Sequence, residues 1–133
     1  FEDNLRFGCA RVVNVASDWA GDLDLDDISF LQRSYDNDTA YRQSKQADRM
    51  LNVTWAERLQ GAVSVNACHP GDPNTKLSTD LGYNIGATRD CKQCCPCPAS
   101  LIVAQKVVTG KYFGEDCRER RCQFATDLFA KLR

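Results

Sequence analysis

Two short runs rich in valine constrain the fold of this chain more than any other feature. They read RVVNVA, from Arg11 to Ala16, and VSVNA, from Val63 to Ala67. Apolar β-branched runs of this kind are typical of strands buried on both faces of a parallel sheet. The segment between them is long enough to hold a crossover helix. We therefore expect two parallel strands joined by a right-handed connection.

The crossover segment carries its own helix signals. Asp38 and Thr39 suit the N-cap position, and Gly61 is a natural stop after Gln60. We predict a long helix between these limits, preceded by a polar, acidic loop over residues 18–37. The inward stripe of this helix, spaced by three or four residues, is predicted to be Ala40, Ser44, Ala47, Leu51, Trp55 and Leu59.

The C-terminal third of the chain predicts two more helices and one more strand. Pro98 suits the first turn of an apolar helix from Ala99 to Thr109, and Lys111 to Phe113 reads as a short strand. Residues 124–132 have the spacing of a final amphipathic helix, whereas Phe1 to Cys9 shows no complete element. Because strands and helices alternate, the predicted fold class is α/β, with about three strands and three to four helices.

Composition argues against several classes of function. Of the 133 residues, 43% are hydrophobic and 26% are charged, and the net charge is −1 with acids and bases interspersed. This balance is typical of a globular protein and lacks the basic surface that nucleic acids require. The longest apolar run, Leu101 to Ala104, is far too short to span a bilayer. We therefore expect no nucleic-acid partner and no transmembrane segment.

Cysteine is unusually frequent, with eight residues, and four of them crowd into Cys91 to Cys97. A secreted disulfide framework spreads its cysteines along the chain, so the crowding favours an intracellular protein. The C-x-x-C and C-x-C spacings here are compatible with zinc or an iron–sulfur cluster. The second C-x-x-C of a strong zinc signature is missing, so we predict a free-thiol loop and no metal. A metal or thiol redox module is the alternative, but it would explain this segment alone.

Tyr41 and Lys45 are the strongest candidates for chemistry. They stand four residues apart on the predicted helix, so the phenol and the ammonium project from the same face. A nearby cation favours the phenolate form of a tyrosine and so suits it to proton exchange with a substrate. Ser17 stands where the first strand ends, and parallel-sheet enzymes bind ligands at the carboxyl ends of their strands. Its hydroxyl is placed to hold a substrate oxygen.

Three motifs in this order resemble the short-chain dehydrogenase/reductase family. They are RVVNVAS from Arg11, AYRQSK from Ala40, and VNACHPG from Val65, the last followed by Thr75. Two further stretches are similar to the retinol dehydrogenase and WW-domain oxidoreductase branch of that family. These are GDLDLDDI, before the tyrosine, and GKYF, near the C-terminal end.

The resemblance implies a doubly wound, Rossmann-like parallel sheet, of which this chain would form the C-terminal part. It implies that Ser17 orients the substrate, that Tyr41 is the acid/base, and that Lys45 binds the ribose of the cofactor beside Tyr41. Pro70, Gly71 and Thr75 would hold the nicotinamide. The implied activity is hydride transfer between a small apolar alcohol and its carbonyl, such as a retinoid or another lipid carbonyl, with NAD or NADP as cofactor.

The sequence also departs from the family pattern. No glycine-rich phosphate loop occurs in it. We therefore expect residues 1–133 to be the C-terminal catalytic half of such a domain, without the N-terminal dinucleotide-binding half and inactive by themselves. The strand over residues 11–16 would then present an open edge that an oligomer or a partner chain could cover. A non-catalytic remnant that serves as a scaffold or assembly subunit is the alternative function that this edge favours.

Overall fold

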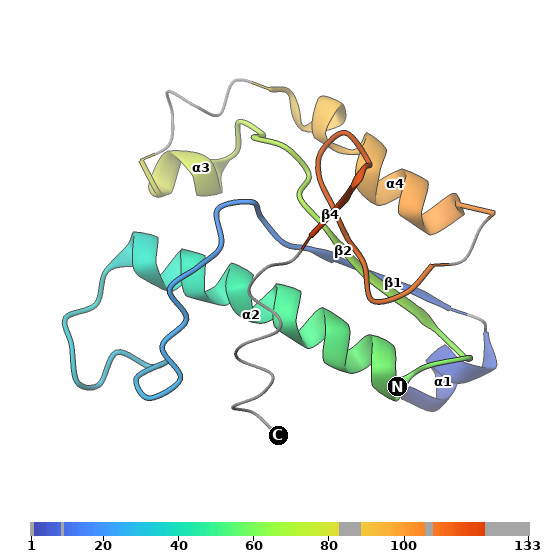
Figure 1. Ribbon diagram of the computed structural model, residues 1–133. Coiled ribbons are helices and arrows are strands. Elements are labelled where there is room, and N and C mark those ends of the chain that lie inside the picture. Colours follow the sequence, from blue (N-terminus) through green and yellow to red (C-terminus); the bar gives the residue numbers. More distant parts are fainter. Residues whose placement is uncertain (1, 9, 83–88, 106–107, 122–133) are drawn as a thin grey trace.

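The computed structural model of the protein describes residues 2–8, 10–82, 89–105 and 108–121. Helices and strands alternate along most of the chain (Figure 1). The elements are α1 (Glu2–Phe7), β1 (Arg11–Val15), α2 (Asn37–Arg58), β2 (Ser64–Cys68), α3 (Lys76–Asp80), the 3-10 helix η1 (Cys91–Cys94), α4 (Pro96–Val103), β3 (Tyr112–Phe113) and β4 (Glu119–Arg120).

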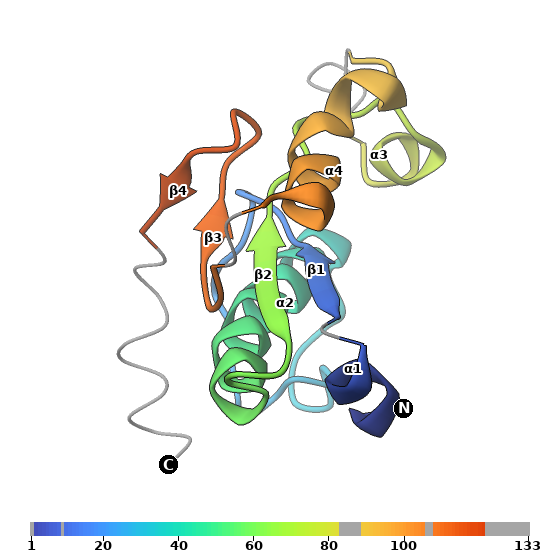
Figure 2. The ribbon, with the colours of Figure 1, turned by 90° about the vertical axis from the view of Figure 1, so that its right-hand side faces the viewer.

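The four strands form one sheet in the order β1-β2-β3-β4 (Figure 2). The first two are parallel over their whole length, with Arg11 opposite Ser64 and Val15 opposite Cys68. Strand β3 continues the parallel sheet, whereas β4 is antiparallel to it. The two valine-rich runs are therefore neighbouring parallel strands, as the sequence predicts.

The sheet lies between two helices, with α4 above it and α2 below it in the view of Figure 1. Successive side chains of a strand point to opposite faces. Val12 accordingly packs on the α2 side, against a cluster that includes Ala56 and Leu59. Val13 packs on the other side, against a cluster that includes Leu101 of α4. The core is thus two thin apolar layers with the sheet between them.

The inward face of α2 differs from the prediction. Of the predicted stripe only Leu59 is buried, while Leu51 is 52% exposed and Trp55 is 39% exposed. The residues that α2 buries are Gln43, Gln46, Arg49, Met50, Asn52 and Ala56. Most of this face is polar because distant segments supply partners for it. Asn52, for example, donates to the carbonyl of Lys111 and accepts from Asn14.

Several element boundaries also differ. Helix α2 is capped by Asp36, whose carboxylate accepts from the Thr39 backbone N–H at 2.8 Å, two residues before the first predicted cap. Helix α4 spans Pro96–Val103 and not Ala99–Thr109, because Pro96 already provides its first turn. Helices α1 and α3, η1 and strand β4 were not predicted; they are six residues long or shorter. The predicted helix over residues 124–132 lies outside the described residues.

Strand β1 forms one edge of the sheet within the described part of the chain. All five residues of β2 are buried, whereas none of the five in β1 is, so burial on both faces holds only for β2. The edge position exposes β1, as expected for a strand that lacks a second neighbour. Among the described helices, none is both long enough and apolar enough to cross a bilayer.

Candidate active site

A cavity of about 520 Å³ opens where β1 and β2 end. Its wall includes all the residues that the sequence singles out for chemistry and cofactor binding, which are Ser17, Tyr41, Lys45, Pro70, Gly71 and Thr75. They come from three separate segments, namely the exit of β1, the first turns of α2 and the chain that follows β2. We call this hollow the site cavity. Its volume is in the range of small-molecule sites.

Tyr41 and Lys45 project together from α2, as their spacing predicts. The Lys45 Nζ lies 5.9 Å from the centroid of the Tyr41 ring. The ammonium donates to the Val15 carbonyl at 3.1 Å and to the Asp48 carboxylate at 3.1 Å. Because an ammonium has three N–H donors, one more can be directed toward a bound molecule. The bond to Val15 also ties α2 to the end of β1.

Ser17 is the second residue after β1 and is only 5% exposed. Its Oγ accepts a hydrogen bond from the backbone N–H of Trp19 at 3.0 Å. This bond uses a lone pair of the hydroxyl and not its hydrogen. The O–H of Ser17 can therefore donate to an oxygen in the site cavity.

The segment after β2 forms the opposite wall through Pro70, Gly71 and Thr75. Gly71 has φ +99°, in the left-handed region that favours glycine. The backbone conformation therefore favours glycine, whereas the atom nearest to an added Cβ, Oε2 of Glu115 at 2.9 Å, ends a flexible side chain that can move aside. Thr75 caps α3 by accepting from the backbone N–H of Ser78 at 3.2 Å. These contacts fix the course of the wall.

His69 joins the two walls and holds its ring in one orientation. Its Nδ1 accepts from the backbone N–H of Asp18 at 3.3 Å, and the residue is 8% exposed. An Nδ1 that accepts from a backbone amide carries no proton, so in the neutral ring the proton lies on Nε2. His69 therefore acts here as a structural link between the exits of β1 and β2.

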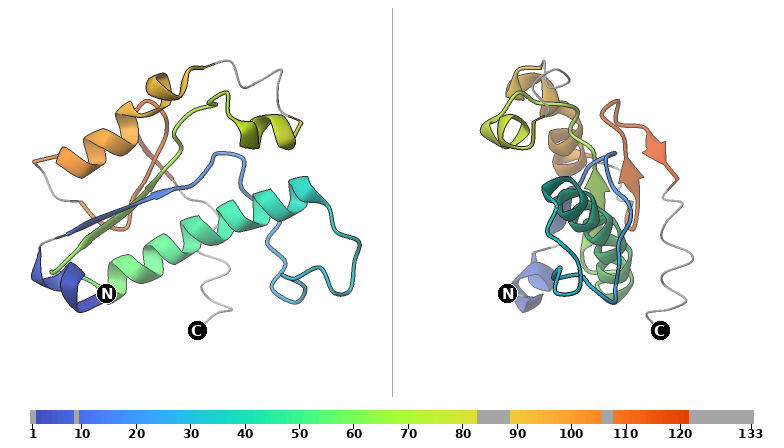
Figure 3. Two further views of the ribbon diagram at one scale, coloured as in Figure 1. Left: turned by 180° about the vertical axis from the view of Figure 1, so that it is seen from behind. Right: turned by 90° about the vertical axis from the view of Figure 1, so that its left-hand side faces the viewer.

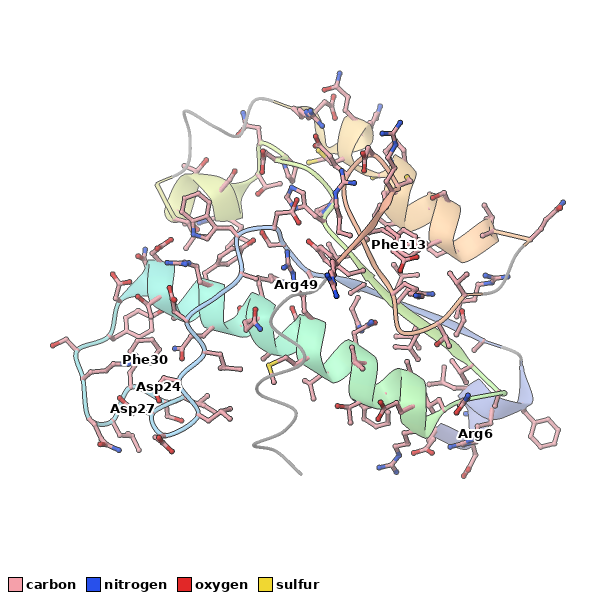
Figure 4. All side chains as sticks on the ribbon, viewed as in Figure 1. Arg6, Asp24, Asp27, Phe30, Arg49 and Phe113 are labelled. Atoms are coloured by element: carbon pink, nitrogen blue, oxygen red, sulfur yellow. The ribbon has the colours of Figure 1, made fainter. Side chains whose placement is uncertain are left out.

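Arg49, Asp18 and Tyr112 lie directly behind Ser17, and the sequence did not single them out. Arg49 projects from the sheet-facing side of α2 and is 7% exposed (Figure 4). Burial, and next the hydrogen bond to Asp18, raise the pKa of Tyr112 well above its usual value, so its hydroxyl stays protonated. The available signal was the spacing, because Arg49 follows Lys45 by one helical turn.

No residue of the cysteine-rich segment is among the described residues that line the site cavity, but the segment packs behind its wall. The Sγ of Cys94 would lie 3.4 Å from a Cβ at Gly71, and the Sγ of Cys91 lies 3.8 Å from the Asn74 carbonyl oxygen. Cys91 and Cys95 are exposed, and Cys94 and Cys97 are buried. Cys97 packs with Cys68 and Leu101 against the sheet. Burial raises the pKa of both the Cys68 and the Cys97 thiol, which favours the unreactive protonated form. Within the described ranges, no cluster of three or more His, Cys, Asp or Glu side chains is arranged to hold a metal ion.

Comparison with known proteins identifies relatives of the chain. No protein-family model matches the chain. It is 37% identical over 81 residues to mouse (Mus musculus) retinol dehydrogenase 13, across 59% of this chain and 24% of that protein. It is 33% identical over 134 residues to a probable oxidoreductase of Streptomyces antibioticus, across 86% of this chain and 45% of that protein. The chain belongs to the short-chain dehydrogenase/reductase family.

Two solved structures share the family fold. An uncharacterized protein from Mycobacterium Paratuberculosis matches with a TM-score of 0.63 at 24% identity, over 92% of this chain and 46% of that one. The NADPH-bound carbonyl reductase from chicken fatty liver matches with a TM-score of 0.58 at 16% identity, over 90% and 47% respectively. The chain is thus part of a doubly wound, Rossmann-like sheet, and it spans less than half the length of the relatives it matches.

Proposed function

We propose that the protein is a nicotinamide-dependent oxidoreductase that interconverts an alcohol and a carbonyl. The observation that carries the proposal is the convergence of Ser17, Tyr41 and Lys45 with the Pro70–Gly71 turn around one cavity. Three segments separated in sequence supply a hydroxyl donor, a phenol and an ammonium at the carboxyl ends of two parallel strands. Sheets of this kind bind their ligands at that place.

Each polar group has a distinct role in this mechanism. The O–H of Ser17 donates to the substrate oxygen and polarises the carbonyl. The Tyr41 hydroxyl gives its proton to that oxygen during reduction and takes it back during alcohol oxidation. Lys45 holds positive charge beside the phenol and has an N–H for a ribose hydroxyl. The nicotinamide, when bound, supplies or accepts the hydride.

The residues present fit the nicotinamide end of such a cofactor. Gly71 leaves the backbone accessible on one wall, and Lys45 supplies a donor on the other. The chain contains no glycine-rich phosphate loop for the pyrophosphate. We therefore assign residues 1–133 to the C-terminal catalytic half of the domain, which needs a dinucleotide-binding half for turnover with NAD or NADP.

The substrate class follows from the remaining lining of the site cavity. Apolar side chains of Val15, Trp19, Leu77 and Leu81 surround the polar group. An apolar body with one alcohol or carbonyl group would satisfy both parts of this lining. A small apolar alcohol or aldehyde is therefore the proposed substrate.

The open edge of β1 is the proposed attachment point for further structure. Its only neighbour in the described sheet is β2. An unpaired edge readily accepts another strand. We place there either the dinucleotide-binding half or another protein chain, which would cover the exposed side of β1.

The test compares two tyrosine variants of the protein at its natural full length, assayed with NADPH or NADH and an apolar aldehyde. Tyr41→Phe should lower kcat by about 100-fold to 10,000-fold, the range for loss of a general acid. The control is Tyr35→Phe, which changes an exposed tyrosine outside the site cavity. Both variants should bind the cofactor with wild-type affinity. The assignment is wrong if Tyr41→Phe retains most of its turnover.

A further inference from the structure

Arg49 carries a charge in the interior of the protein, between α2 and the sheet. Arginine is almost never fully buried unless its guanidinium is paired. Here the two N–H groups of Nη2 serve three acceptors, one of them shared: the Ser17 carbonyl at 2.5 Å, the Tyr112 hydroxyl at 2.7 Å and the Asp18 carboxylate at 3.1 Å. The guanidinium also lies over the Tyr112 ring, 3.9 Å from its centroid. One side chain of α2 thus joins the exit of β1 to β3.

Tyr112 and Asp18 complete a closed triangle of interactions. The Tyr112 hydroxyl donates to Oδ1 of Asp18 at 2.5 Å, the same oxygen that accepts from Arg49. Tyr112 is 5% exposed, and its strand is fixed to β2 by the pairing with Ala67. The triangle therefore anchors the Asp18 side chain to the sheet.

This triangle bears directly on Ser17. Arg49 holds the Ser17 carbonyl, and the next residue, Asp18, is held through both its side chain and its backbone. The Asp18 N–H donates to His69, and the Trp19 N–H donates to the Ser17 Oγ. All these contacts fall within three consecutive residues. They fix the backbone from which the Ser17 hydroxyl projects into the site cavity.

We infer that Arg49, with Asp18 and Tyr112, is a positioning device that fixes the Ser17 hydroxyl toward the substrate oxygen. The inference rests on the proposed function for its catalytic meaning, whereas its structural part can be measured alone. Fold stability does not call for an ion pair here, because apolar side chains of similar size often replace buried ion pairs without loss. The Nε of Arg49 has no hydrogen-bond partner among the described residues, so the arrangement is not an optimal stabilising one. What the guanidinium does achieve is a fixed Ser17 carbonyl.

The main variant is Arg49→Met, which keeps the aliphatic length and removes the charge. The side chain of Asp18 is 54% exposed, so water can solvate it once Arg49 is gone, and Tyr112 retains its bond to Asp18. The variant should therefore fold. Because a small misplacement of a catalytic group costs up to about 100-fold, we expect kcat to fall by about 10-fold to 100-fold. The KM for NADPH should stay within about twofold of the wild type, because Arg49 does not line the site cavity.

Asn52→Leu is the matched control. Asn52 is on the same buried face of α2, is 1% exposed, and bonds β1 through Asn14 and the β3 end through Lys111. It touches neither Ser17 nor Asp18 in any hydrogen bond of the described structure. A general loosening of the helix on the sheet would affect both variants alike. An equal loss of kcat in the two would therefore overturn the positioning role.

A second readout needs no turnover. The backbone amides of Asp18 and Trp19 report the order of the Ser17 turn, since their partners are His69 and the Ser17 Oγ. In Arg49→Met these two amides should exchange with deuterium about 10-fold faster, while the β1 amides and Asn52→Leu stay near wild-type rates. Unchanged exchange at Asp18 and Trp19 would refute the inference even if the protein proved inactive. If instead the proposed function is wrong, Tyr41→Phe will retain most of its turnover.

Discussion

The two hollows beside α2 have nearly the same size but differ in their charged groups, because Lys45 and Asp72 line only one of them. The site cavity measures about 520 Å³, and the second hollow, which we call the apolar groove, measures about 470 Å³. The groove lies between α2 and the loop of residues 16–36, and α3 stands on the other side of the N-terminal half of α2 (Figure 3). One helix thus serves two hollows with different faces.

The groove has no charged residue among the described residues that line it. Its walls are mostly apolar, with Leu23, Leu25 and Phe30 from the loop and Ala47 from the helix. The hydroxyl of Ser44, which also lines it, is turned back to the Tyr41 carbonyl at 2.7 Å. The site cavity instead collects side chains at strand ends, among them the ammonium of Lys45. Volume therefore does not distinguish the two hollows, whereas the charged side chains and the position at the strand ends do.

The largest expected effect separates two cations of α2. Lys45 lines the site cavity, whereas Arg42 pairs with Asp22 at 2.7 Å outside it. Lys45→Met should lower kcat/KM about 100-fold in the protein at its natural full length, because it removes the charge beside the Tyr41 phenol. Arg42→Met should stay within about twofold. Steady-state reduction of an apolar aldehyde checks both, and similar losses would erase the distinction between the faces.

The second prediction concerns the free energy of unfolding after truncation of two neighbouring side chains of α2. Met50 is 3% exposed and Leu51 is 52% exposed, although the sequence pattern placed Leu51 inward. Met50→Ala should lower the free energy of unfolding by about 2–4 kcal/mol, as for other buried methionines. Leu51→Ala should cost less than about 1 kcal/mol, because half of its surface is already in water. Urea unfolding of both variants decides, and a larger cost at Leu51 would restore the predicted stripe.

The smallest expected effect is on the pH dependence of stability. The pKa of Tyr112 is raised in the folded protein, whereas a tyrosine in the unfolded chain has a pKa of about 10. The stabilisation of the folded state by the protonated Tyr112 is therefore complete below that pH and is lost as the pH rises further. Between about pH 10 and 11, the Tm of Tyr112→Phe should fall less steeply with rising pH than the Tm of the wild type. The control is Tyr35→Phe at an exposed position, which should follow the wild-type curve. Parallel curves for wild type and Tyr112→Phe would argue against a raised pKa.

The sequence predicted those parts of the fold that local preferences decide. The strands at residues 11–15 and 64–68 fall on the two runs that contain valine, the strand at 112–113 is aromatic, and α2 has a capping carboxylate and is followed by a glycine. The buried face of α2 could not be read in this way. Gln46, Arg49 and Asn52 are inside because segments far away in the chain border them, and periodicity of apolar residues carries no information about such partners.

The candidate site also has a part that the sequence predicted and a part that it did not. The grouping of Ser17, Tyr41 and Lys45 in one cavity follows from a strand end and a helical spacing, both readable in the sequence. Their catalytic roles stay predictions. The residues behind them were missed because Tyr112 looks like an ordinary strand residue, and only the sheet order brings it next to Asp18.

The Tyr112–Asp18 bond has a consequence for how the protein is made. It joins residues 94 positions apart. Every described residue that lines the site cavity precedes β3 in the chain, so these residues leave the ribosome before the tyrosine that steadies Ser17. Contacts of such long sequence separation form late, because the closure of the intervening chain must come first. The nascent chain should therefore hold its chemical groups in an unfinished arrangement, competent to act only once the third strand has joined the sheet.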